Sequence, residues 1–288
     1  MKYGVIDVGS NSVRLMMSDG VKSLYKQVCT TRLAEGMNAD NMLNEKAVER
    51  TVSAVSFFVD KAKEENADKI FIFATAAVRK AVNSYIFTDL VYNSCGIKVD
   101  VISGQKEALT GMIGALSYQD GAIIDVGGAS TEISVVKGGN VLYSKSIDIG
   151  SVVLFNQCGQ DYDKAKAFVA SKILEFRGVP NCNFVGIGGT ATSVASMLQE
   201  LEPYDPEKVD GYFVGIENLS ILLEKLYGMS VEERKKLKGL QPERAKVIAG
   251  GVLILHSVLS LLKKDGYTAS ERDNLEGYLT LKLEGEHE

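Results

Sequence analysis

One short motif is written twice in this chain of 288 residues, about one small domain apart. Residues 6–12 read IDVGSNS and residues 124–130 read IDVGGAS, so Ile, Asp, Val, Gly and Ser recur in the same order. In both copies an apolar run precedes a turn of small residues and a second run follows it, which predicts strand, tight turn and strand. The repeat therefore predicts two domains of similar fold, each presenting an aspartate beside a glycine turn.

The residues after each copy follow a similar plan. Each pass reads as three antiparallel strands followed by alternating helices and strands, such as the helix expected at 44–66 and the buried strand expected at 69–75. This pattern predicts an α/β fold with two mixed sheets, each covered by helices. We expect an N-terminal domain over residues 1–118 and a C-terminal domain over 119–288, with a cleft between them. The last helix, at about 273–285, is free to pack back on the first domain.

Composition excludes several classes of function. The net charge of −5 gives no global attraction to nucleic acid or to an anionic membrane. The longest apolar run, at 247–262, is shorter than the ~20 residues of a membrane span, and Asp7 interrupts any signal-peptide pattern. The four cysteines are far apart, which favours free thiols in the cytoplasm. With His256 expected in the core and His287 in the tail, histidine triads and histidine-rich metal sites are disfavoured.

The chemistry of the repeated turn points to an anion. A tight turn of small residues exposes successive backbone N–H groups in a nest that binds phosphate. An aspartate just before the turn, Asp7 or Asp125, would repel that phosphate unless a cation lies between them, and Mg²⁺ is the natural choice, with Mn²⁺ as a substitute. A third glycine turn follows a strand and opens a helix, which also favours an anion. Taken singly, each turn is equally well an ordinary hairpin. The candidate phosphate-binding residues of the three turns are Gly9, Ser10, Asn11, Gly127, Gly128, Ala129, Ser130, Gly188 and Gly189.

Five segments together resemble one protein family. They are IDVGSNSVRL from residue 6, ATAAVRKAVN from 74, VISGQKEA from 101, DVGGASTEI from 125 and GIGGTATS from 186. In this order they resemble the Ppx/GppA phosphatases, which are exopolyphosphatases and guanosine pentaphosphate phosphohydrolases. The resemblance implies two ribonuclease-H-like domains of the actin/Hsp70/sugar-kinase superfold, Mg²⁺ at the site, and hydrolysis of a terminal phosphoanhydride. The chain is similar to the short, two-domain members.

The resemblance also implies roles for individual residues. Glu107 matches the catalytic glutamate, Arg79 the phosphate-binding arginine, and Asp125 and Glu132 the acids on the metal side. Asp7 is the counterpart of Asp125 in the first domain and is expected as an outer-sphere ligand of the metal. Each has a plainer interpretation as well. A carboxylate such as Glu107 in the first turn of a helix is stabilised by the helix dipole, and an arginine after a strand is commonly a solvated charge.

The sequence departs from the family pattern at three places, one of which is the absence of a frequent arginine from IDIGSVVL at 147–154. Ala129 stands where a third glycine is frequent, and alanine disfavours positive φ, so we expect a narrower nest. Leu109 replaces a frequent arginine, which removes one cation and predicts a weaker grip on long polyphosphate.

Several functions stay open at this point. An exopolyphosphatase is favoured, the alternatives being a guanosine pentaphosphate phosphohydrolase and a non-catalytic polyphosphate- or nucleotide-binding regulatory protein. An ATP-dependent kinase on the same superfold is a weaker alternative. Glu107 separates phosphatase from binding protein, because a binding protein needs the turns but no base. A homodimer is compatible with the sequence.

Overall fold

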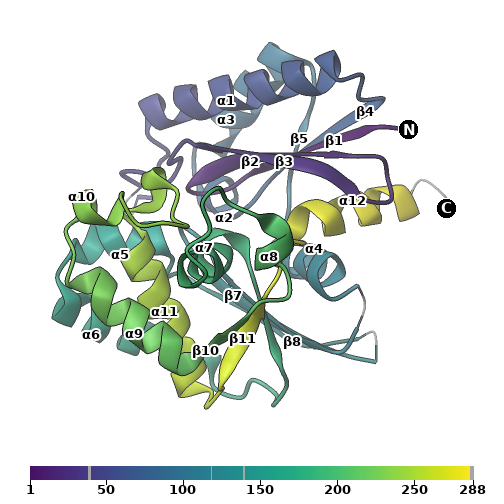
Figure 1. Cartoon of the computed structure of the whole chain (residues 1–288). Helices are drawn as coiled ribbons and strands as arrows, with labels where there is room; N and C mark the ends of the chain where they lie inside the picture. The colour runs from purple at the N-terminus through teal and green to yellow at the C-terminus, as the bar shows by residue number, and fades with distance from the viewer. Residues whose placement is uncertain (38–39, 118, 139, 286–288) are drawn as a thin grey trace. The chain divides into compact units, whose positions relative to one another are not determined.

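The computed structural model describes residues 1–37, 40–117, 119–138 and 140–285 (Figure 1). The chain forms two compact mixed α/β units. Unit 1 comprises Met1–Thr110 and Asn274–Glu288, and unit 2 comprises Gly111–Asp273. The C-terminal segment therefore belongs to the same unit as the N-terminus.

Unit 1 is built on a mixed sheet with strand order β3-β2-β1-β4-β5 in the described residues. Strand β1 pairs antiparallel with β2 and parallel with β4. The strands are β1 (Tyr3–Val8), β2 (Ser12–Ser18), β3 (Ser23–Thr30), β4 (Lys69–Ala74) and β5 (Val99–Val101). The helices that begin in this unit are α1 (Glu45–Glu64), α2 (Ala76–Lys80), α3 (Ser84–Cys95), α4 (Gly104–Leu116) and α12 (Asn274–Glu284).

Helix α1 covers one face of this sheet. The side chain of Asn44 caps it by accepting hydrogen bonds from the amides of Lys46 and Ala47, as an N-cap asparagine does. Its apolar stripe, which includes Val55 and Phe58, packs in the same buried cluster as Ile6 and the other residues on that side of the sheet. This is the helix that the spacing of apolar residues predicts for 44–66.

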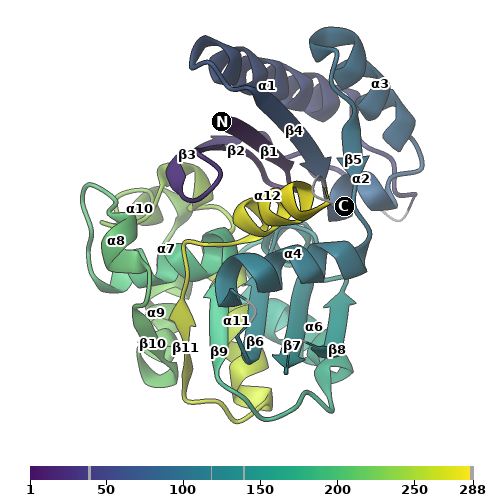
Figure 2. The same cartoon turned by 90° about the vertical axis from the view of Figure 1, so that its right-hand side faces the viewer.

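Helix α12 covers the opposite face of the sheet (Figure 2). The Tyr278 ring stacks on Phe73 with 4.4 Å between ring centroids, and the Tyr278 hydroxyl donates to the carboxylate of Asp100 over 2.8 Å. Each large side chain fully buried in this way contributes about 1.5–3 kcal/mol of transfer free energy. The last helix begins at Asn274, near the expected position, and completes the core of unit 1.

Unit 2 repeats the same sheet with one additional edge strand. Its order in the described residues is β10-β11-β9-β6-β7-β8, and its last five strands correspond, read backwards, to β3-β2-β1-β4-β5. The strands are β6 (Gly121–Val126), β7 (Thr131–Lys137), β8 (Asn140–Ile147), β9 (Phe184–Ile187), β10 (Phe213–Gly215) and β11 (Gly266–Ala269). The helices are α5 (Ser151–Cys158), α6 (Tyr162–Ile173), α7 (Gly188–Leu198), α8 (Pro206–Val209), α9 (Ile216–Tyr227), α10 (Val231–Arg234) and α11 (Ile248–Leu261).

The long apolar run at 247–262 forms the buried helix α11, which packs in the core of unit 2. His256 on this helix is half-buried and shares a 2.8 Å hydrogen bond with the hydroxyl of Ser220. In the part of the chain that the structure describes, no helix is long and apolar enough to cross a membrane.

Candidate functional site

The two copies of the motif form turns with the same closing hydrogen bond. The amide of Gly9 donates to the carbonyl of Ser12 over 3.0 Å, and the amide of Gly127 donates to the carbonyl of Ser130 over 3.0 Å. A Cβ on either glycine would crowd that carbonyl oxygen, at 3.1 Å for Gly9 and 3.3 Å for Gly127. Glycine is favoured at both positions for the same reason, so the likeness of the two motifs extends to their geometry.

In unit 1 the carbonyl side of the turn is bound by the segment after β3. The Ser10 carbonyl accepts from the amide of Ala34 over 2.9 Å, and the Asn11 carbonyl accepts from Thr31 and Arg32 over 3.0 and 2.8 Å. Within the described residues, the amides of Ser10 and Asn11 have no acceptor. The turn therefore directs its acceptors into the fold and keeps donors for an anion.

In unit 2 the corresponding carbonyls are bound by the N-terminus of α5. The Gly127 carbonyl accepts from the amide of Ser151 over 2.9 Å, and the Gly128 carbonyl accepts from Val152 and Val153 over 2.9 and 3.1 Å. The structure thus repeats the arrangement of unit 1 with a different partner segment. The turn is held rigidly from its carbonyl side in both units.

Two small residues make this arrangement of the second turn possible. A Cβ on Gly150 would lie 2.4 Å from the carbonyl oxygen of Gly128, so glycine there allows α5 to approach the turn. Ala129 is not among the described residues with positive φ, and its amide has no acceptor within them. The strain expected from alanine at this position therefore does not arise.

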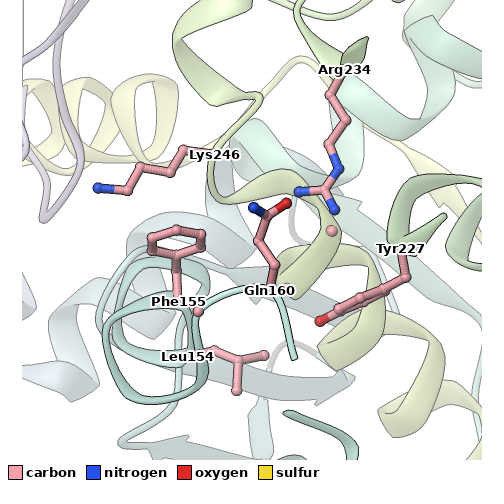
Figure 3. A pocket seen from close by; sticks show the side chains of 9 residues that line it. Leu154, Phe155, Gln160, Tyr227, Arg234 and Lys246 are labelled. Atoms are coloured by element: carbon pink, nitrogen blue, oxygen red, sulfur yellow. The ribbon is translucent and has the colours of Figure 1, made fainter. Parts of the chain in front are cut away.

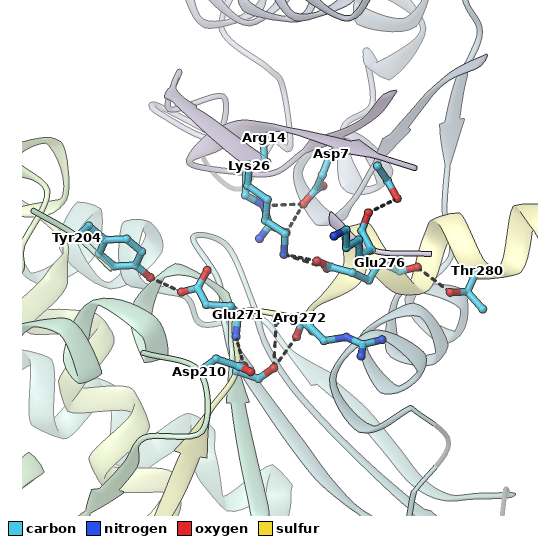
Figure 4. A network of polar contacts seen from close by, with 12 residues as sticks. Asp7, Arg14, Lys26, Tyr204, Asp210, Glu271, Arg272, Glu276 and Thr280 are labelled. Atoms are coloured by element: carbon cyan, nitrogen blue, oxygen red, sulfur yellow. Dashed lines mark hydrogen bonds and ion pairs between the residues drawn. The ribbon is translucent and has the colours of Figure 1, made fainter. Parts of the chain in front are cut away.

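The residues opposite the two aspartates differ in charge. Asp7 lies opposite Arg14 in the β1–β2 pair, and Asp125 lies opposite Glu132 in the equivalent β6–β7 pair. The Nη2 and Nε atoms of Arg14 lie 2.5 and 3.1 Å from Oδ2 of Asp7 (Figure 4). In unit 2 an acid takes the place of that arginine, and Glu132 accepts a 2.6 Å hydrogen bond from the hydroxyl of Ser146. Unit 1 thus pairs its aspartate with the Arg14 guanidinium. Unit 2 instead places two carboxylates side by side on one face of its sheet.

The third turn brings Asp125 and a further cation together in unit 2. Gly188 opens α7 with a φ of +75°, and a Cβ on it would lie 2.4 Å from Oδ1 of Asp125. A Cβ on the next residue, Gly189, would lie 2.0 Å from Nη1 of Arg244. The Asp125 carboxylate and the Arg244 guanidinium therefore both lie directly against the glycine pair. Any larger residue at either position would have to displace them.

Arg244 was not among the residues expected from the sequence. It lies in a short 3₁₀ turn at Pro242–Arg244, far along the chain from the glycine pair. One signal was present, since Gly189 lies in the first turn of a helix, where glycine costs about 1 kcal/mol relative to alanine unless close packing requires it. Arg244 supplies unit 2 with a cation beside the glycine pair.

Glu107 and Arg79 meet in unit 1. Glu107 lies in the first turn of α4 and is 9% exposed. Nη1 of Arg79, in the last turn of α2, donates to Oε2 of Glu107 over 2.6 Å and to the carbonyl of Ile102 over 3.0 Å. The structure therefore places the expected base and the expected phosphate-binding arginine in direct contact.

The acids differ in how well they suit a metal. Asp125 and Glu132 offer carboxylate oxygens, the ligand type that Mg²⁺ prefers, from facing register positions. Asp7 is bound by Arg14 instead, so its charge is already compensated. No group of three or more His, Cys, Asp or Glu side chains in the described ranges could hold a metal by itself. The chemistry of the pair in unit 2 fits a divalent cation, although two carboxylates alone do not complete its ligand set.

Comparison with known proteins agrees with these features. The bifunctional 3-dehydroquinate synthase/phosphatase of Fusobacterium nucleatum is 31% identical over 314 residues, which cover 97% of this chain and 46% of that protein. The chain thus spans about half the length of that relative. Exopolyphosphatase 2 of Mycobacterium tuberculosis is 28% identical over 317 residues, with 99% of both chains covered.

A solved structure has the same fold. The crystal structure of the Aquifex aeolicus member of the Ppx/GppA protein family superposes with a TM-score of 0.80 at 27% identity, over 100% of this chain and 99% of that one. Two mixed α/β units with the fold of a Ppx/GppA family member are therefore confirmed. The family model described as the Ppx/GppA phosphatase family matches residues 13–286. The chain belongs to the Ppx/GppA phosphatase family.

Proposed function

We propose that this chain is a metal-dependent hydrolase that removes the terminal phosphate from inorganic polyphosphate. The observation that carries the proposal is the contact between Glu107 and Arg79, 2.6 Å apart in unit 1. A protein that only binds phosphate needs the arginine and the turns. It has no use for a largely buried carboxylate fixed beside that arginine.

In this proposal Glu107 is the general base. Water attacks the terminal phosphorus, the bond from that phosphorus to the bridging oxygen breaks, and the Glu107 carboxylate takes the proton of the water. Arg79 binds oxygens of the transferred phosphoryl group with the guanidinium N–H groups that Glu107 and Ile102 do not use. The products are orthophosphate and a chain shorter by one phosphate.

The turns supply the remaining phosphate contacts. We assign the amides of Ser10 and Asn11 to one phosphate and those of Gly128 and Ala129 to another, with Gly9, Gly127 and Ser130 shaping the turns. The pair Gly188 and Gly189 adds a third donor turn at the start of α7, where the helix dipole favours an anion. Arg244 contributes a full positive charge beside it.

Asp125 and Glu132 are the residues that would hold Mg²⁺, or Mn²⁺ in its place. When bound, the ion neutralises charge on phosphate oxygens. Asp7 acts in unit 1 through Arg14, whose guanidinium it holds on the strands that flank the first turn. We also place the protein in the cytoplasm, a proposal supported by the four cysteines, which are all free in the structure.

Polyphosphate is the preferred substrate because the relative named exopolyphosphatase 2 matches over nearly the full length of both chains. The test is phosphate release from polyphosphates of several lengths, guanosine pentaphosphate and ATP, each with Mg²⁺ and each compared with the Glu107→Gln variant. We expect release from polyphosphate to exceed release from the other two. Release no faster than that of the variant on every substrate would contradict a hydrolase, and faster release from guanosine pentaphosphate would overturn the substrate assignment.

A further inference from the structure

A hollow in unit 2 contains a buried arginine (Figure 3). Arg234, at the end of α10, is 1% exposed. Its Nε donates to the carbonyl of Leu226 over 2.7 Å and its Nη1 reaches the carbonyl of Ala245 over 3.5 Å. Its Nη2 is buried and has no hydrogen-bond partner among the described residues. One arm of the guanidinium therefore faces the hollow with its donors unused.

One further residue of the lining, Lys246, is positively charged. None of the nine described residues around the hollow is acidic. Lys246 lies on the other side, with Nζ 4.8 Å from the ring centroid of Phe155. Ala249 and Gly250, in the first turn of α11, complete this side, and first-turn amides carry the partial positive charge of a helix N-terminus.

A guanidinium in this position is costly without a negative partner. Burial lowers the pKa of Arg234, with the nearby Tyr227 opposing that shift. A cation–π contact with Tyr227 offsets part of the free-energy cost of burying this guanidinium, since the Cζ of Arg234 lies 6.0 Å from the centroid of the Tyr227 ring. A neutral ring does not satisfy the Nη2 donors, however, and a buried cation is normally paired with an anion.

We propose that this hollow binds a single phosphate group through Arg234 and the N-terminus of α11, with Lys246 turning inward from its position in Figure 3, where its ammonium extends away from the guanidinium. Two full positive charges and a helix N-terminus match the double negative charge of a phosphate, and the planar fork of an arginine fits its oxygens. The amide of Gln160, which Figure 3 shows extending toward the guanidinium, is placed to close the site from the rim. The proposal concerns binding alone and does not depend on hydrolysis.

The phosphate group has two sources, the free ion and the end of a longer chain. We would titrate the intact, ¹⁵N-labelled chain with inorganic phosphate and with tripolyphosphate, following the Arg234 Nε–H signal and the amide of Gly250 by NMR. Saturable shifts with the free ion alone assign the site to orthophosphate. Tighter binding of tripolyphosphate at the same signals assigns it to a terminal phosphate.

Substitutions show whether these shifts arise in the hollow. Lys246→Gln removes one charge without touching the buried arginine, and should weaken binding at these signals roughly tenfold, the effect of one charge-assisted contact. Lys225→Gln removes the same charge from the exposed side of α9 and should leave binding unchanged. The proposal is wrong if millimolar phosphate does not shift the Arg234 signal, or if chloride shifts it equally at the same concentration. It is also wrong if the Lys246→Gln and Lys225→Gln variants bind phosphate with the same affinity.

Discussion

Nη1 of Arg79 is shared between the Glu107 carboxylate, 2.6 Å away, and the carbonyl of Ile102, 3.0 Å away. One nitrogen thus fixes the position of the carboxylate relative to the end of β5. The side chain of Arg79 is 22% exposed and that of Glu107 is 10% exposed, so the pair lies at the surface edge of unit 1 and can meet a ligand. Substitutions at these two positions should therefore separate binding from proton transfer.

Glu107→Gln should lower turnover roughly 100-fold or more, because an amide keeps the shape of the side chain and cannot accept a proton. The measurement is kcat for phosphate release, together with the dissociation constant for tripolyphosphate, which should change little. Glu45→Gln is the matched control, since Glu45 is an exposed carboxylate in the first turn of α1. Equal turnover in the two variants would remove Glu107 from the mechanism.

Asp125→Asn and Glu132→Gln should raise the Mg²⁺ concentration needed for half-maximal activity, because each removes charge from the face that carries both acids. Asp7→Asn should leave that concentration nearly unchanged and instead lower the free energy of unfolding by about 2 kcal/mol, since it breaks the Asp7–Arg14 pair. Metal titrations and denaturant unfolding of the three variants test this division. A shift for Asp7→Asn as large as that for Asp125→Asn would place the metal elsewhere. Full wild-type activity after exhaustive chelation would show that the reaction needs no metal.

Gly188→Ala should disturb Asp125 beyond the cost of an unfavourable backbone angle. Its φ is +75°, and the new Cβ would lie 2.4 Å from the Asp125 carboxylate. Gly178 has a φ of +85° and nothing within 4 Å of an added Cβ, so Gly178→Ala isolates the backbone cost of about 1 kcal/mol. We expect Gly188→Ala alone to weaken Mg²⁺-dependent activity. The same activity in both variants, measured at saturating and limiting Mg²⁺, would show that the contact with Gly188 does not position Asp125.

Arg244→Lys should raise KM for short polyphosphates about fivefold to tenfold, with a smaller effect on kcat. Lysine keeps the charge and loses the planar fork that fits phosphate oxygens. Arg177→Lys changes an exposed arginine of the same unit in the same way and serves as the control. If the two variants share one KM, Arg244 packs against Gly189 for structural reasons only.

The sequence predicts the fold well where its patterns are long or repeated. Helix α1 and the strands around both turns follow from periodicity that extends over many residues. Helix α5 was not predicted, because Val152 and Val153 favour a strand and only the close approach at Gly150 explains why the chain turns into a helix there. Strands β10 and β11 have three and four residues, which is too short for alternation to show.

The candidate site is predictable from sequence to the extent that its residues lie in local motifs. The turns, the aspartates and Glu107 lie in such motifs. The strand register determines that Asp7 lies opposite Arg14 whereas Asp125 lies opposite Glu132, and the motifs alone do not give that register. The approach of Arg244 to Gly189 depends on the tertiary fold. Contacts between residues far apart in sequence leave no periodic signal, so they emerge only from the structure.

Gly9→Val and Gly127→Val should each weaken the binding of tripolyphosphate, because we propose that the amides of each turn bind a phosphate group. In each case the first new carbon would crowd a carbonyl oxygen, at 3.1 Å in unit 1 and 3.3 Å in unit 2, and the turn would have to shift. Loss of one charge-assisted contact costs roughly 1.5–3 kcal/mol, so each variant should bind about tenfold or more weakly. Gly138→Val, in the β7–β8 hairpin with nothing within 4 Å of an added Cβ, controls for a valine placed in a hairpin, and its φ of +57° adds a backbone strain that the other two variants lack.

Orthophosphate tests the same two turns with a single phosphate group. If the amides of a turn bind phosphate, the valine variant of that turn should also bind orthophosphate more weakly than Gly138→Val does. Calorimetric titration of both anions into the three variants and wild type measures this directly. If either Gly9→Val or Gly127→Val binds tripolyphosphate as tightly as Gly138→Val does, that turn is an ordinary hairpin and binds no phosphate of the substrate.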